Sequence, residues 1–433
     1  MKYLQYKTLK WKIIKQLSNL NFSIGLLLTI STISILGTVI EQDKNIDFYQ
    51  FNYPIKPDIS YVINWKNILY FGLNHIYTNW WFILLIALFF CSLITCTFSQ
   101  QMPSLRNARH WKFIPYNKNK NSNIDYLPIK SFINIIYSLS QHNYYVFQRN
   151  NKIYGYKGLI GRLAPIFVHI SIIITLTGNM LGLFTGFISQ EIIPKGETFH
   201  IQNFIKSGKY SYLPYNIIGK IDNFSIEYNP NSSIKQFYSS ISLKNNKNEN
   251  LIQQKIYVNS PLKFHGLTFY QTSWNLEGLK IQIDNKLIQQ KLQEIKINKI
   301  RTWIYNFNFT NHNSLFFLVN GLNNKILIYN SSGQLLQSIQ TNETFNIHGH
   351  QITIKEIIPS TGIQIKTDPG IPIVYLGFFI LIISIITSYL SYNQIWINIE
   401  NNKIHLKGTT NRGQLTFEEE LTQIQKYYIK VTI

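Results

Sequence analysis

Four long apolar stretches without a formal charge constrain this chain more than any other feature of the sequence. They cover Phe22–Ile40, Trp80–Phe98, Leu163–Ile188 and Ile371 to about Tyr392. Each is long enough to cross the roughly 30 Å hydrocarbon layer of a bilayer as an α-helix. The first is followed by Glu41-Gln42-Asp43 rather than by a small-residue cleavage site, which argues against a cleavable signal peptide. We therefore expect a membrane protein with four transmembrane helices.

The net charge of +21 is concentrated beside particular apolar stretches. Residues 1–21 hold five lysines and no acid, and residues 99–162 hold ten Lys or Arg and one acid; residues 41–79 hold three lysines and four acids. Because positive charge near helix ends marks the inside face, both termini and residues 99–162 are expected inside, and the other two loops outside. The basic charge accompanies no nucleic-acid-binding motif, so we expect no nucleic-acid partner.

The long segment between the third and fourth stretches, residues 189–370, has the alternating pattern of β-strands. Clusters of Asn, Gly, Ser and Pro separate the candidate strands. These are Gly219–Tyr228, Phe237–Leu243, Lys255–Val258, Leu267–Tyr270, Lys280–Ile283, Ser314–Val319, Lys325–Tyr329 and Gln351–Ile357. The pattern predicts a mostly β domain, either a sandwich or a barrel.

The basic loop and the C-terminal tail carry weaker signals. Helical spacing of Ile129, Phe132, Ile135, Ile136 and Leu139 predicts a short amphipathic helix. Tyr144–Gln148 and Lys152–Tyr156 flank an Arg-Asn-Asn turn, which predicts a hairpin. The tail from about Ile395 is polar, and we expect it to be small and partly ordered. The expected segments are thus 1–21, 22–98 with two helices, 99–162, 163–188, 189–370, 371–394 and 395–433.

His169 is the ionisable residue inside the third apolar stretch. Such a side chain is costly in a membrane and usually faces a partner, a cavity or a cofactor. Imidazole is a common haem ligand, although a hydrogen bond to a neighbouring helix is an equally open interpretation. Gly178, Gly182 and Gly186 repeat every four residues and could admit a neighbouring helix. Gly178 lies half a turn from His169, so the glycines should occupy the opposite face. A ligand at His169 would be met from the inside face, roughly 9 Å away.

Other residues with reactive side chains form weaker patterns. Cys91 and Cys96 are five residues apart on one expected helix, so they point in different directions and are not a disulfide pair. Residues 189–370 contain no cysteine and therefore cannot perform dithiol chemistry. His348 and His350 have metal-like spacing, but a hairpin tip is the simpler interpretation. Trp80 and Trp81 are expected to be interfacial anchors, with a haem platform as the alternative.

Several motifs, in order along nearly the whole chain, resemble the ResB (CcsB) family of cytochrome c biogenesis proteins. The third-helix motif resembles Lys157-Gly158-Leu159-Ile160-Gly161-Arg162 followed by His169-Ile170-Ser171. The outer-domain signature resembles Ser260-Pro261-Leu262 and Gly266-Leu267-Thr268-Phe269-Tyr270-Gln271-Thr272-Ser273-Trp274. Further matches are Gly37-Thr38-Val39-Ile40-Glu41-Gln42, Trp80-Trp81-Phe82, Cys96-Thr97, Asp368-Pro369-Gly370-Ile371-Pro372 and Asn411-Arg412.

The resemblance implies a System II protein that works with a CcsA (ResC)-type membrane partner to move haem b across the membrane to apocytochromes c. The chain uses Ile, Asn, Lys and Gln heavily, as proteins of AT-rich genomes do, and this fits a plastid-encoded member. The inside is then stroma, the outside is thylakoid lumen, and cytochrome f is one acceptor. The family's third-helix histidine corresponds to His169, which implies an axial bond to haem iron. His265 is a second cofactor-binding candidate, with a surface turn as its alternative.

The expected role is that of a non-catalytic, haem-handling subunit rather than an enzyme. Two other classes stay open from the sequence. In the first, the chain is a scaffold that docks the partner and the apocytochrome without binding haem. In the second it is a transporter, which would require several polar intramembrane residues or paired broken helices.

Overall fold

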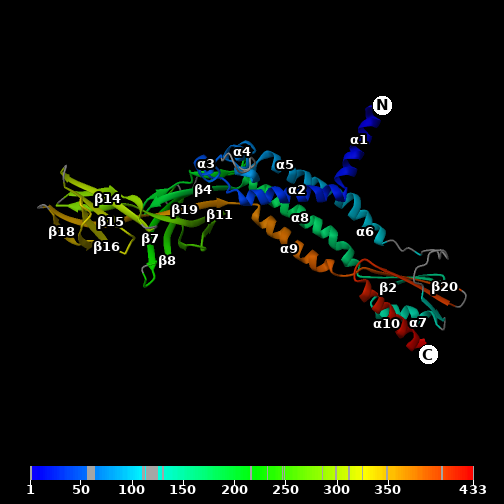
Figure 1. Cartoon of the computed structure of the whole chain (residues 1–433). Coiled ribbons are helices and arrows are strands. Elements are labelled where there is room, and N and C mark those ends of the chain that lie inside the picture. Colours follow the sequence, from blue (N-terminus) through cyan, green and yellow to red (C-terminus); the bar gives the residue numbers. More distant parts are fainter. Residues whose placement is uncertain are drawn as a thin grey trace. The chain divides into compact units, whose positions relative to one another are not determined.

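The structure, a computed structural model, describes residues 2–55, 64–109, 113, 125–128, 131–214, 217–231, 233–245, 247, 249–284, 286–297, 300–310, 313–323, 325–347, 350–400 and 403–432. The chain folds as two compact units. Residues 1–179 and 371–433 form one unit, and residues 180–370 form the other. The first carries most of the long apolar helices, and the second is built of strands (Figure 1).

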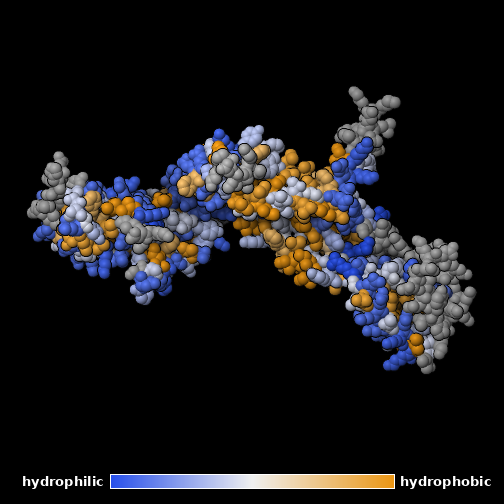
Figure 2. All heavy atoms as spheres, viewed as in Figure 1, coloured by the Kyte–Doolittle hydropathy of each residue, from blue (hydrophilic) through white to orange (hydrophobic). Residues whose placement is uncertain are grey.

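Among the described residues, four helices are long and apolar enough to cross a membrane, which confirms the four spans expected from the sequence. They are α2 (Leu20–Val39), α5 (Trp80–Cys96, continued by the π-helix η2, Thr97–Gln101), α8 (Leu159–Thr185) and α9 (Ile371–Ser388). Figure 2 shows hydrophobic residues concentrated over these helices. Many of their large side chains are exposed within this single chain, as expected for helices that face lipid.

Shorter helices flank the first two spans. They are α1 (Lys2–Leu17) before α2, α6 (Met102–Arg109) after η2, and α3 (Ile46–Asn52), α4 (Trp65–Tyr70) and η1 (Leu73–Thr78) between α2 and α5. The connection between α2 and α5 has its own small core of Ile40, Tyr49 and Ile68. The Tyr49 hydroxyl donates to the Glu41 carbonyl at 2.5 Å, so the described part of this loop is folded onto the end of α2.

Helices α8 and α9 approach each other through small residues. A methyl group at Gly377 of α9 would collide with Thr175 Oγ1 and would lie 3.0 Å from the Ser171 carbonyl oxygen of α8. At the start of α8, a methyl group at Gly161 would collide with the Leu390 carbonyl oxygen. Close backbone approach of this kind is the usual packing mode of membrane helices, where apolar side chains gain little by avoiding lipid.

Two segments far apart in the sequence, 125–157 and 391–432, form one domain, which we call the discontinuous domain. Its five-stranded antiparallel sheet has the order β1-β21-β20-β3-β2. Its elements are β1 (Asp125–Pro128), α7 (Phe132–Gln141), β2 (Tyr145–Arg149), β3 (Lys152–Lys157), β20 (Asn393–Glu400), β21 (Lys403–Thr410) and α10 (Gln414–Thr432). Its core includes Ile135, Leu139, Ile153, Ile395, Ile397, Phe417 and Ile424.

The expectation of a small, partly ordered tail is therefore wrong. Strand β20 pairs with β3, with Ile395 opposite Gly155 and Ile397 opposite Ile153. Helix α10 contributes Phe417 to the shared core. The tail supplies only part of a core that residues 131–157 complete, and such distant pairing leaves no local sequence signal. The expected amphipathic helix and hairpin are confirmed as α7 and β2–β3, with Ile129 of the expected helix lying outside the described residues.

A polar cluster centred on Glu420 joins the two segments of this domain. Its carboxylate accepts from Lys157 Nζ at 2.5 Å, Asn393 Nδ2 at 3.0 Å and the Tyr144 hydroxyl at 3.1 Å. Burial raises the pKa of Tyr144, and the nearby Glu420 carboxylate raises it further, so Tyr144 remains a donor. Glu420 therefore connects α10, β20 and the chain that leads into α8.

The inserted β domain comprises β4 to β19, which form three open sheets. The strands are β4 (Phe187–Pro194), β5 (Thr198–Phe199), β6 (Phe204–Ser207), β7 (Ile217–Tyr228), β8 (Ile234–Asn245), β9 (Asn250–Tyr257), β10 (Leu262–Phe264), β11 (Leu267–Ile283), β12 (Lys286–Lys291), β13 (Gln293–Ile297), β14 (Ile300–Thr310), β15 (Asn313–Val319), β16 (Lys325–Asn330), β17 (Leu335–Gln340), β18 (Thr344–Ile347) and β19 (His350–Thr367). One sheet has seven strands, in the order β10-β11-β19-β4-β6 with β12 beside β11 and β18 beside β19. The others are the meander β13 to β17 and the four-stranded β5-β7-β8-β9. The mostly β character expected of this segment is thus confirmed, as stacked sheets rather than one closed barrel.

Strands β11 and β19 form the long antiparallel pair on which both cores of this domain are built. One core holds Leu267 and Phe269 of β11 together with Ile363 of β19; the other holds Leu279 and Ile354 of the same strands. The sequence predicted two short strands where the structure has the single 17-residue β11. Bulges between Gln271 and Ser273 and between Leu276 and Gly278 shift the alternation, which explains the error.

Replacing Glu420 by Ala should destabilise the discontinuous domain by about 1–3 kcal/mol, because three donors lose their common acceptor. Hydrogen exchange of the full chain in lipid nanodiscs should then be faster in α10 and β20 than in the unmodified protein. Glu419→Ala is the matched control, since Glu419 is the preceding, exposed residue of the same helix. Equal exchange in the two variants would contradict a structural role for Glu420.

Candidate functional site around His169

His169 lies in the first half of α8 and contacts the end of α5. Its Nδ1 atom is 3.1 Å from Thr97 Oγ1. Thr97 begins η2, the short π-helical continuation of α5. Such π-turns are rare and often occur at functional sites, because the extra residue in the turn redirects neighbouring side chains. The contact therefore joins two membrane-spanning helices at the one ionisable side chain of α8's apolar interior.

The hydrogen bonds of Thr97 determine which nitrogen of His169 is protonated. Thr97 Oγ1 lies 2.7 Å from the Leu93 carbonyl oxygen, which can only accept. The hydroxyl has a single proton, which we assign to the Leu93 carbonyl because that contact is the shorter of the two. Thr97 Oγ1 must then accept from His169, so a neutral imidazole held in this way carries its proton on Nδ1.

The remaining nitrogen, Nε2, keeps its lone pair. Within the part of the chain that the structure describes, it has no hydrogen-bond partner, and the side chain is half-buried. A histidine that ligates a metal usually donates its other N–H to a fixed acceptor, which orients the ring and sets its tautomer. The donor set at His169 therefore fits an axial ligand for haem iron, with Nε2 as the ligating atom and Thr97 as the residue that positions it.

The two faces of α8 meet different neighbours. Ser171 and Thr175, on the face away from His169, approach α9, as expected of that face, and buried Gly178 lies on the same face because it follows Ser171 by seven residues. A methyl group at Gly182 would instead lie 2.5 Å from Asp368 Oδ1, and one at Gly186 would lie 2.9 Å from the Thr367 carbonyl oxygen. These two glycines admit the chain that leaves the β domain. The sequence carries no signal for this, because a strand end and a helix require the same small residues.

His265 belongs to the β domain and occupies a tight turn. It links β10 to β11, where Phe264 pairs directly with Leu267, so the loop is His265-Gly266. Both loop residues have positive φ, 45° and 81°, as a two-residue type I′ turn requires. The imidazole is exposed, and its ring centroid is 4.4 Å from that of Phe264. His265 therefore lies in a surface turn, the alternative that the sequence analysis left open.

The other candidate residues form no site among the described residues. Cys91 and Cys96 are free, as expected; Cys91 is exposed and Cys96 is buried. His348 lies outside the described residues. His350 Nδ1 lies 2.8 Å from Asp284 Oδ2, and this hydrogen bond lowers the pKa of the Asp284 carboxyl. No group of three His, Cys, Asp or Glu side chains that could hold a metal occurs in the described ranges.

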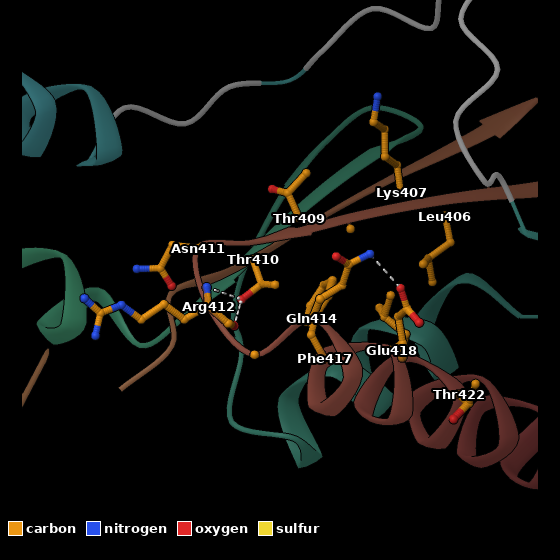
Figure 3. Close-up of a pocket in the computed structure, with 13 residues that line it drawn as sticks. Leu406, Lys407, Thr409, Thr410, Asn411, Arg412, Gln414, Phe417, Glu418 and Thr422 are labelled. Carbon is orange, nitrogen blue, oxygen red and sulfur yellow. Dashed lines mark hydrogen bonds between the residues drawn. The ribbon is translucent and has the colours of Figure 1, made fainter. Parts of the chain in front are cut away.

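A polar pocket of about 680 Å³ lies in the discontinuous domain, between β21 and the start of α10 (Figure 3). It is lined by Leu406, Lys407, Gly408, Thr409, Thr410, Asn411, Arg412, Gly413, Gln414, Phe417, Glu418, Leu421 and Thr422. Gln414 Nε2 donates to Glu418 Oε1, and the Arg412 amide donates to Thr410 Oγ1. Lys407 and Arg412 extend in different directions, so they do not form one anion clamp. The lining includes neither imidazole nor thiol, so it does not fit haem iron.

Thr97 is the residue that sequence reasoning missed. In the sequence, the Cys96-Thr97 pair matches a family motif, but no pattern there indicates a role for Thr97. Thr97 is 72 residues from His169, and a threonine at the end of an apolar helix usually bonds to its own backbone. The structure shows both interactions at once.

Within the part of the chain that the structure describes, four helices long and apolar enough to span a bilayer and an inserted β domain indicate a polytopic membrane protein. The sequence model of the ResB-like family matches residues 20–355 and 334–422. The chain belongs to the ResB-like family.

Curated relatives match over almost their full length. The cytochrome c biogenesis protein Ccs1 of Gracilaria tenuistipitata var. liui is 49% identical over 430 residues, 98% of this chain and 99% of the relative. The protein of the same name from Pyropia yezoensis is 47% identical over 427 residues, 97% and 96% of the two chains. The cytochrome c biogenesis protein CcsB of Crocosphaera subtropica is 40% identical over 424 residues, 95% and 93% of the two chains.

The tautomer of His169 can be measured by ¹⁵N NMR of histidine-labelled protein in nanodiscs, with His169→Gln used to assign the signal. We expect protonated Nδ1 and unprotonated Nε2. Thr97→Val removes the acceptor, worth about 0.6–1.5 kcal/mol, and should move the tautomer ratio toward Nε2–H by roughly threefold to tenfold.

Thr95→Val is the matched control for this measurement, because the Thr95 hydroxyl bonds to the Cys91 carbonyl on its own helix. It should leave the His169 signal unchanged. An Nε2-protonated ring in the unmodified protein would contradict the assignment of Thr97 as the acceptor.

Proposed function

We propose that this protein acts in c-type cytochrome biogenesis, as a non-catalytic subunit of a complex that delivers haem b across a membrane to apocytochromes. The observation that carries the proposal is His169, whose Nδ1–H is held by Thr97 and whose Nε2 lone pair is left for a ligand. The similarity to the cytochrome c biogenesis proteins Ccs1 and CcsB supports the same role.

The chain's contribution to this process is ligation and orientation. Haem is the cargo, and its iron would accept an imidazole nitrogen on each face. His169 supplies one of these nitrogens through Nε2, and Thr97 holds the ring in the ligating orientation and tautomer. The apolar residues around His169 on α8 keep water from the bound iron. The second axial nitrogen comes from the partner subunit.

The membrane in this proposal is the plastid thylakoid, because most of the relatives come from algae. The basic segments then place both termini and the discontinuous domain in the stroma, and the β domain in the lumen. Cargo enters from the stromal side, where Thr97 ends α5. The partners are a CcsA (ResC)-type membrane protein and apocytochromes c such as cytochrome f.

His265 is assigned to the lumenal step rather than to the membrane site. Its imidazole is exposed on a two-residue turn of the domain proposed to be lumenal, the compartment in which haem would be attached to the apocytochrome. The β domain has no cysteine, so its part in attachment is positioning rather than thiol exchange.

Visible absorption spectra of the chain purified with its CcsA-type partner test the membrane site. His169→Ala should lose most of the bound haem or convert it to high spin, and added imidazole should restore the six-coordinate spectrum. Thr97→Val should retain the ligand but weaken haem retention by about 10- to 100-fold, the usual effect of losing an outer-shell partner. An unchanged spectrum in His169→Ala would instead support a scaffold that docks the partner and the apocytochrome without binding haem.

The separate role of His265 has its own variant. His265→Asn keeps a residue that tolerates the left-handed backbone of the turn. This variant should leave the spectrum unchanged but reduce covalent haem attachment to a co-expressed apocytochrome. Full attachment in His265→Asn would show that His265 serves only the turn.

A further inference from the structure

The segment Phe204–Tyr212, which we call the lip, lies beside the end of α8 that leads into the β domain. It consists of the edge strand β6 and the loop that follows it. Gly208 N donates to the Gly186 carbonyl at 2.9 Å, and Tyr210 N donates to the Phe184 carbonyl at 2.8 Å. The lip therefore runs antiparallel to the chain leaving α8 and reaches back to the last turn of the helix.

The height of that turn in a membrane follows from two charge markers. Arg162 is the charged residue at the other end of α8, and Phe184 follows it by 22 residues, or roughly 33 Å of helix. The hydrocarbon layer is roughly 30 Å thick. Asp368, which approaches Gly182, pairs with Lys366 at 3.5 Å, so charged groups also occur at this level on the neighbouring chain. Residues 182–186 thus lie at the boundary between hydrocarbon and headgroups.

The side chains of the lip have the composition that this boundary selects. Tyr210 is 68% exposed, Tyr212 is 80% exposed and Ile205 is 55% exposed. Lys206 and Lys209 lie between them, and the Lys209 ammonium is 5.8 Å from the ring centroid of Tyr210. Tyrosine and lysine are enriched at membrane interfaces because each combines an apolar body with a polar end.

We propose that the lip is a lipid-binding element, inserted among the headgroups with Tyr210 and Tyr212 as its anchors. Strand β6 is an edge of the seven-stranded sheet, and all four of its residues are exposed. An exposed apolar edge in water invites pairing with other chains. In the headgroup layer, lipid and interfacial water would cover this edge, and the lysines would favour anionic lipids.

The lip is also rigid enough to act as an anchor rather than as a tether. The Ser207 and Ser211 hydroxyl oxygens are 2.7 Å apart, and Ser211 Oγ donates to the Gly208 carbonyl at 2.9 Å. A methyl group at Gly208 would collide with the Phe184 backbone. The lip's position against the end of α8 is therefore fixed by backbone contacts at Gly208 and Tyr210.

A fluorescent label at Tyr212→Cys in the full chain tests the proposal. The background carries Cys91→Ala and Cys96→Ala, and the protein is reconstituted in nanodiscs containing a lipid with a nitroxide on its headgroup. We expect blue-shifted emission that the nitroxide lipid quenches. Leu336→Cys is the control, because Leu336 is an exposed residue of β17. The sheet that contains β17 packs on the core that holds Leu279 and Ile354. The control label should be neither shifted nor quenched.

Two other outcomes would overturn the proposal. An unshifted label at position 212 would place the lip in water. A shifted label without quenching would mean that protein, not lipid, covers it. If the cysteine-replaced background does not accumulate, the native cysteines are kept and the emission of protein without the third cysteine is subtracted. None of these results depends on haem, so they are independent of the proposed function.

Discussion

Close contact between glycines of α8 and the chain on either side of α9 is the constraint on which the membrane part of the structure depends. At one end, Gly161 admits the Leu390 carbonyl oxygen, which belongs to the chain leaving α9. At the other end, Gly182 admits Asp368, which precedes α9. A side chain at Gly161 would displace the backbone of the chain that leaves α9, whereas one at Gly182 would displace the end of the Asp368 side chain. His169 lies between these two glycines on α8 and contacts a third helix through Thr97.

The contact with Thr97 gives His169 a hydrogen-bond partner on a neighbouring helix. An imidazole in a membrane needs a partner for each ring nitrogen, because water is not available to replace one. Thr97 satisfies only Nδ1. A histidine whose purpose was to tie two helices together would gain from a second partner. Among the described residues, one nitrogen is oriented by Thr97 and the other has no partner, an arrangement that supports the proposed role as a metal ligand.

The features that the sequence predicted well are those with a local cause. Uncharged length identifies a membrane helix, and two-residue alternation identifies strands such as β7. The sequence did not reveal β20 as the partner of β3, because Ile395 and Gly155 are distant and neither segment forms a core alone. It divided β11 in two because bulges interrupt the alternation. For the site, it identified His169 from polarity alone, but Thr97 required three-dimensional proximity.

The two histidines discussed above lie in different compact units of the chain. Every residue of the candidate ligand site belongs to residues 1–179, whereas His265 belongs to residues 180–370. His169 and Thr97, the two residues of the candidate membrane site that the structure describes, thus both come from outside the β domain. If the protein moves haem from one compartment to the other, holding it in the membrane and presenting it outside are separable tasks. Different histidines would then carry them, and a defect in one step need not abolish the other.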